Sequence, residues 1–145
     1  MNMKQNNLLF FQELDICIRS YHQFQQELLD KAGIDITPDQ WLVLDQLRRG
    51  KSRNQREIAQ KLDKDAASVN RMLVLLEKKG YISRLAADTA RKSLKPRVTE
   101  EGMRVFESAG LALSMAAEAA MKDIKPKRFV KLGKTLHDIT KNLKK

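Results

Sequence analysis

The sequence is poor in the residues that form cross-links, turns and metal sites. Its 145 residues include one cysteine, three prolines and two histidines. The single cysteine, Cys17, excludes a disulfide framework or a multi-cysteine zinc site within the chain. A chain of this length buries about two-thirds of its unfolded surface on folding, so it needs neither. We therefore expect one domain, spanning residues 1–145.

Long apolar runs and catalytic patterns are also missing. No run approaches the roughly 20 apolar residues of a membrane-spanning helix, and the N-terminus lacks the pattern of a secretory signal. A cytoplasmic protein without a membrane partner is the default expectation. The sequence has no Gly-rich phosphate loop and no Ser/His/Asp or Cys/His arrangement. His22 and His137 lie far apart, and we predict no catalytic residue, no metal site and no cofactor.

Positive charge is abundant and unevenly distributed. The net charge of +10 divides into −2 over residues 1–50, +8 over 51–97, −2 over 98–122 and +6 over 123–145. A basic block between acidic segments indicates a surface that binds a polyanion. A generally basic but inert surface is the alternative interpretation.

Apolar residues recur at spacings of three and four through most of the chain, which predicts a mainly α fold. Cap residues, glycines and prolines mark the ends of the helices. The expected helices cover 8–29, 37–50, 54–62, 65–80 and 99–121, and a last one follows Lys125-Pro126. Residues 81–86 and 93–98 have the pattern of two short strands, joined by a polar turn at 88–92.

The segment from Arg53 to Thr99 predicts a helix-turn-helix followed by a wing, an arrangement that places a helix in the major groove of DNA. In the helix over 65–80, one face is apolar, and Arg71 and Val74 lie on the opposite face with Asn70 beside them. Arginine bonds guanine, asparagine bonds adenine, and small apolar side chains contact the thymine methyl group. An ordinary solvated helix face is the alternative.

A basic hairpin tip, Arg91-Lys92, is expected to enter the minor groove, which attracts cations where it is narrow. A solubilising loop is the alternative here. The residues predicted to contact DNA are Arg53, Gln55, Lys64, Ala66, Ala67, Ser68, Asn70, Arg71, Val74, Arg84, Arg91 and Lys92.

From Thr37 to Gly102 the sequence resembles the MarR family of winged-helix transcriptional regulators. The matching residues are Thr37-Pro38 with Gln40, Glu57-Ile58-Ala59 with Leu62, Val69-Asn70-Arg71, Leu76-Glu77-Lys78-Lys79-Gly80-Tyr81-Ile82, Arg84, Arg91-Lys92 and Thr99-Glu100-Glu101-Gly102. The resemblance implies a DNA-binding lobe over about 37–98, between dimerisation helices over about 8–30 and 99–145. It also implies a homodimer on a pseudo-palindromic site in double-stranded DNA, acting as a repressor that a small molecule releases.

The wing departs from the family pattern. The family usually has an acidic residue just before the basic pair and an arginine second in that pair, where this chain has Ala90 and Lys92. The missing carboxylate normally orients Arg84 or the wing arginine, and Asp88 is the candidate substitute. Lysine lacks the planar fork of arginine, so looser reading of the minor groove is expected.

The resemblance also implies a cavity for a small phenolic or aromatic acid. The residues expected to line this cavity are Arg19, Tyr21, His22, Trp41, Met103 and Phe106, although an ordinary hydrophobic core is the favoured alternative for such a cluster. One branch of the family senses peroxides through a cysteine in its first helix. Here Cys17 lies close to the apolar stripe of its helix, and we expect an inert packing residue.

Two other functions remain open. An architectural protein would coat DNA without sequence preference, and a winged helix can also bind an acidic protein partner. The outward Ser68, Asn70 and Arg71 favour a sequence-specific regulator, because coating DNA needs little beyond lysine and arginine.

Overall fold

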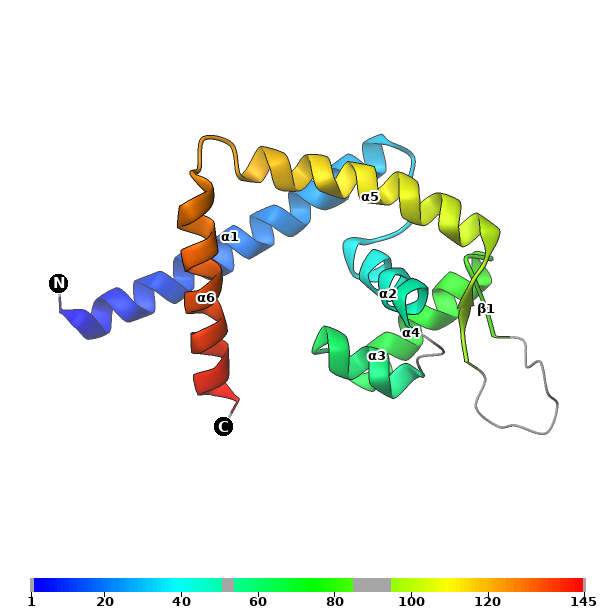
Figure 1. Ribbon diagram of the computed structural model, residues 1–145, viewed down its shortest axis with the longest axis horizontal. Helices are drawn as coiled ribbons and strands as arrows, with labels where there is room; N and C mark the ends of the chain where they lie inside the picture. The colour runs from blue at the N-terminus through cyan, green and yellow to red at the C-terminus, as the bar shows by residue number, and fades with distance from the viewer. Residues whose placement is uncertain (1, 51–53, 85–94, 145) are drawn as a thin grey trace.

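The computed structural model describes residues 2–50, 54–84 and 95–144. Its elements are α1 (Met3–Lys31), α2 (Pro38–Arg49), α3 (Gln55–Leu62), α4 (Ala66–Lys78), β1 (Ile82–Ser83), β2 (Arg97–Val98), α5 (Glu100–Ala120) and α6 (Pro126–Leu143). Figure 1 shows a lobe formed by α2, α3, α4 and the hairpin, beside the long helices α1, α5 and α6. The predicted fold, mainly α with a small β-hairpin in a winged helix-turn-helix, is confirmed.

Local cap residues determine where the helices of the lobe begin. At α2, the backbone N–H of Gln40 donates to Thr37 Oγ1 at 3.1 Å, and the N–H of Thr37 donates to Gln40 Oε1 at 3.0 Å. Asn54 and Glu57 make the same reciprocal pair at α3. Both are capping boxes, which satisfy backbone donors that have no partner inside the helix. After α4, Gly80 adopts a φ of +79°, the left-handed conformation that ends many helices.

The core of the lobe fixes the angle between α3 and α4. Ile58 of α3 packs with Val69, Leu73 and Leu76 of α4 and with Leu44 of α2, and all five side chains are at most 1% exposed. Burying each such side chain contributes about 1.5–3 kcal/mol. The helix-turn-helix is therefore held rigidly on α2.

The first helix is longer than expected and the strands are shorter. Helix α1 begins at Met3, because Asn2 and Gln5 form a capping box that precedes the apolar stripe. In the hairpin, Ile82 pairs with Val98 and Ser83 with Arg97. Strand β2 begins directly after Pro96, which cannot donate a ladder hydrogen bond. The predicted strands covered 81–86 and 93–98, but positions 81, 84, 95 and 96 are not in strands. Residues 85–94 lie outside the described residues.

Helices α1 and α6 leave much of their apolar surface uncovered in the single chain. Phe11 and Ile18 of α1 are 45% and 43% exposed, and Phe129 and Leu132 of α6 are 41% and 47% exposed. Helix α6 has no buried residue among those described. Cys17 is exposed as well, so its prediction as a buried packing residue is wrong for the single chain. No helix in the described part of the chain is long and apolar enough to cross a membrane.

Candidate nucleic-acid interface

Helix α4 has the two faces that the sequence predicted. Val69, Leu73 and Leu76 are buried, whereas Ala66, Ala67, Arg71 and Val74 are exposed. Ser68 and Asn70 are half-buried at the border of the exposed face. The small residues of the first turn let the N-terminal end of α4 approach another surface closely. The outward face therefore combines a short contact distance with polar side chains that can bond base edges.

A chain of hydrogen bonds orients Arg71. Its Nη2 donates to Ser68 Oγ at 3.0 Å, and Ser68 Oγ donates to Asp65 Oδ2 at 2.7 Å. The backbone N–H of Ser68 donates to Asp65 Oδ1 at 2.8 Å. The side-chain hydrogen bond from Ser68 is the main cause that lowers the pKa of Asp65 below its ordinary value, with the backbone hydrogen bond second. At neutral pH the Asp65 carboxylate is therefore charged, caps α4 and holds the Ser68–Arg71 pair in place.

Gln55 and Lys64, also predicted to contact DNA, are engaged in contacts within the lobe. Gln55 Nε2 donates to the carbonyl oxygen of Ala66 at 2.9 Å, which joins the beginnings of α3 and α4. Lys64 Nζ lies 3.1 Å from Asp39 Oδ2, and its side chain is 26% exposed. Both contacts position α4 against the rest of the lobe.

Arg84 connects the base of the wing to α4. Its Nε lies 3.4 Å from Glu77 Oε2, and its side chain is 23% exposed. Within the described residues, Nε and Nη2 are buried without a hydrogen-bond acceptor. Sequence reasoning missed Glu77 as the carboxylate that pairs with this arginine, because Glu77 belongs to another element. Arg53, Asp88, Ala90, Arg91 and Lys92 lie outside the described residues.

A cavity of about 810 Å³ lies between α1, α2 and α5. Four of the six predicted residues line it, namely Tyr21, His22, Trp41 and Phe106. Arg19 is not part of this lining; it is exposed and pairs with Asp15 at 3.0 Å. Met103 is not part of it either, since it lies one turn closer to the hairpin and lines a smaller cavity with Arg97 and Val98.

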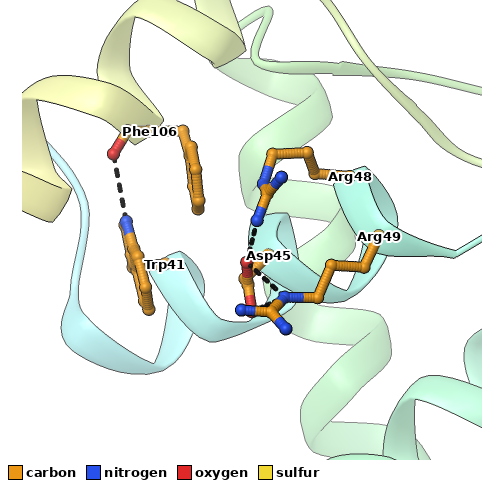
Figure 2. Close-up of polar contacts among 5 residues, drawn as sticks. All are labelled: Trp41, Asp45, Arg48, Arg49 and Phe106. Carbon is orange, nitrogen blue, oxygen red and sulfur yellow. Dashed lines mark hydrogen bonds and ion pairs between the residues drawn. The ribbon is translucent and has the colours of Figure 1, made fainter.

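The aromatic cluster serves both as core and as cavity wall. The rings of Trp41 and Phe106 are stacked, with centroids 5.0 Å apart and an interplanar angle of 6°. Trp41 Nε1 donates to the carbonyl oxygen of Phe106 at 3.0 Å. Figure 2 shows Phe106 between Trp41 and Arg48, whose guanidinium carbon lies 5.0 Å from the Phe106 centroid. Arg48 and Arg49 both bind the buried Asp45 carboxylate, each at 2.9 Å.

A second groove, of about 710 Å³, lies between α1, α5 and α6. Cys17, Ile18, Met121, Phe129 and Leu132 line it, among others. Tyr21 and Ala117 belong to the linings of both this groove and the cavity. The two openings are therefore neighbours that share part of a wall.

Comparison with known proteins agrees with this geometry. Residues 34–93 match the sequence model of the MarR family. The chain is 32% identical over 111 residues to the HTH-type transcriptional regulator PrsX of Escherichia coli, covering 72% of this chain and 67% of PrsX. It is 25% identical over 143 residues to YhbI of Bacillus subtilis, an uncharacterized HTH-type transcriptional regulator, covering 97% and 93% of the two chains.

Solved structures share the fold at lower identity. A MarR family transcriptional regulator from Rhodococcus sp. RHA1 has a TM-score of 0.74 at 18% identity, with 96% of each chain covered. Wild-type MarR of E. coli in its apo form has a TM-score of 0.69 at 20% identity, covering 88% of this chain and 94% of MarR. With its winged helix, outward α4 face and these relatives, the chain belongs to the MarR family of DNA-binding transcriptional regulators.

Proposed function

We propose that this protein is a sequence-specific repressor that binds a pseudo-palindromic operator as a homodimer and is released by a small molecule. The observation that carries the proposal is the outward face of α4, where Ser68 holds Arg71 in one orientation. Within the described residues only one N–H donor of Arg71 is engaged, so its planar fork remains available for a bidentate contact with guanine. Non-specific coating of DNA needs no such arrangement.

We propose that a second copy of the chain covers the exposed apolar surfaces of α1, α5 and α6. Exposed large apolar residues occur along α1, α5 and α6, including Phe11, Leu111, Met115, Phe129 and Leu132. Soluble monomers rarely leave contiguous apolar patches larger than a few hundred Å². A two-fold dimer through these helices places two α4 helices on half-sites about one helical turn, roughly 34 Å, apart.

The position of the cavity supports release by a ligand. Its walls come from the long helices α1 and α5 and from α2, and α2 packs on α3 and α4. A ligand that fills the cavity contacts both the dimerisation helices and the DNA-binding lobe. Binding would then favour one distance between the two α4 helices over another, which is what a release mechanism requires.

Replacing Arg71 with alanine is expected to weaken binding to the preferred operator roughly 5- to 150-fold per half-site and to relax its sequence choice, because one bidentate base contact discriminates by about 1–3 kcal/mol. The operator is first selected from a random pool of duplexes, and dissociation constants are then measured on it and on scrambled DNA. Lys78→Ala is the control, since Lys78 is an exposed cation at the other end of α4. It should weaken binding to both DNAs equally. An equal loss on both DNAs with Arg71→Ala would contradict a base-reading role.

The salt dependence of operator binding provides a further test. If each dimer neutralises about eight phosphates, the logarithm of affinity should fall against the logarithm of salt concentration with a slope of about −7. The slope is measured by titration at several salt concentrations. Affinity that does not change with salt would contradict the assigned DNA interface.

The basic block alone would equally suit an architectural protein. Competition with random duplex DNA separates the two functions. A regulator retains its selected operator when random DNA is in excess, whereas an architectural protein yields no selected sequence and is displaced.

A further inference from the structure

The charged side chains that line the cavity between α1, α2 and α5 are acidic. Asp39 and Glu107 are part of its lining, and no lysine or arginine of the described residues is. This is unusual in a chain with 28 lysines and arginines and a net charge of +10. Asp39 already pairs with Lys64 at 3.1 Å. Glu107 is exposed and has no ion-pair or hydrogen-bond partner in the described part of the chain, so it supplies an uncompensated negative charge.

Three arginines close to lining residues are engaged elsewhere, and one of them, Arg104 on α5, pairs with Glu101 at 2.7 Å. Arg19 pairs with Asp15, and its side chain is 69% exposed. Arg48 is bound to Asp45 and lies on the opposite side of Phe106 from Trp41 (Figure 2). An anionic ligand in the cavity would therefore face Glu107 without a lysine or arginine as its partner, and like charges at close range repel.

The remaining walls suit a flat ring. Tyr21, Trp41 and Phe106 supply aromatic surface, and Leu42 and Leu113 supply aliphatic surface. Gly110 lies beside the indole: a Cβ at this position would be 3.7 Å from Trp41 Nε1. The absence of a side chain there keeps the edge of the indole open to the cavity. Aromatic rings also attract cations through their quadrupole.

We propose that this cavity binds a planar aromatic cation, with Glu107 as its counter-charge and the aromatic walls as its contact surface. The inference rests on the proposed ligand-responsive function and specifies its effector class. A cation takes the place of the aromatic acid that the family resemblance implies, because no lysine or arginine of the described residues lines the cavity to bind a carboxylate.

The test compares three ligands that share one ring system and differ in charge: N-methylquinolinium, quinoline and quinoline-2-carboxylate. Binding to the full chain without DNA is measured by calorimetry at neutral pH. Trp41 is the single tryptophan, so its indole N–H resonance reports whether the ligand occupies this cavity. The cation is expected to bind about tenfold more tightly than the carboxylate, with quinoline between them, and its advantage should shrink as salt is added.

A pair of matched variants tests the role of Glu107. Glu107→Gln should reduce the affinity for the cation several-fold and leave that for quinoline unchanged. Glu118→Gln removes the same charge from an exposed position of α5 outside the cavity lining and should change neither. The proposal is overturned if the carboxylate binds as tightly as the cation, if Glu107→Gln behaves like Glu118→Gln, or if none of the three ligands shifts the Trp41 resonance. Operator binding is measured separately on the unliganded protein, so failure of the regulator function is distinguished from failure of this inference.

Discussion

Replacing Leu132 with glutamate is expected to convert the proposed dimer into monomers and to weaken operator binding by about 100-fold or more, because two linked half-site contacts become one. Leu132 is 47% exposed in the single chain and lines the groove between α1, α5 and α6. A carboxylate there would have to be buried at the dimer interface, and removing it from water costs several kcal/mol even where Arg128, one turn earlier in the same groove, can pair with it. Sedimentation equilibrium measures the mass, and titration of the selected operator measures the affinity.

The control for this variant is Lys134→Gln. It changes the net charge by the same amount and lies on the opposite side of α6, two residues away. It should leave the dimer intact and weaken operator binding only slightly. A Leu132→Glu protein that remains dimeric, or a wild-type protein that is monomeric at micromolar concentration, would contradict the assigned interface.

Replacing Gly102 with alanine is expected to destabilise the protein by about 3 kcal/mol, at the upper end of typical overpacking costs. Gly102 is buried in the first turn of α5, where an added Cβ would overlap the carbonyl oxygen of Tyr81 and lie 2.9 Å from both the Tyr81 carbonyl carbon and Val98 Cγ1. The backbone of Tyr81 cannot move away easily, because its carbonyl oxygen accepts the N–H of Thr99 at 3.0 Å. The start of α5 would have to separate from the base of the hairpin.

Urea unfolding at fixed protein concentration measures this loss. Gly133→Ala is the matched control, since no atom other than those of its chain neighbours and the backbone of its own helix lies within 4 Å of the position its Cβ would occupy. In an exposed helix this change should stabilise the chain by up to about 1 kcal/mol. Equal stability of Gly102→Ala and wild type would show that α5 and the hairpin are not packed as closely as described.

The parts of the fold that sequence reasoning predicted correctly depend on neighbouring residues. The capping boxes at Thr37 and Asn54 each involve residues three positions apart, and the faces of α4 follow from helical periodicity. Pairs between distant elements could not be predicted in this way. Lys64 reaches Asp39 across 25 positions, and Glu77 reaches Arg84 from a different element. These pairs depend on how the elements pack, which no local pattern encodes.

Periodicity also could not distinguish a surface that is buried in the fold from one that is left for a partner. The apolar stripe of α1 has the same spacing in either case, which explains why Cys17 was expected to be buried although it is exposed in the single chain. The set of residues that line the cavity differs from the predicted set for a related reason. Arg19 precedes Tyr21 and His22 on the same helix, but its side chain is 69% exposed, pairs with Asp15 and is not part of the cavity lining.

Tyr21 and Ala117 line both the cavity and the groove assigned to the second chain. Thermodynamic linkage then applies to the two binding events. If a ligand shifts Tyr21 and changes the affinity between the chains by some factor, association of the chains changes the affinity for the ligand by the same factor. The measured ligand affinity would then change as the protein concentration passes through the dimer dissociation constant. One ligand dissociation constant would apply well below that concentration, where the protein is monomeric, and another well above it, where the protein is dimeric.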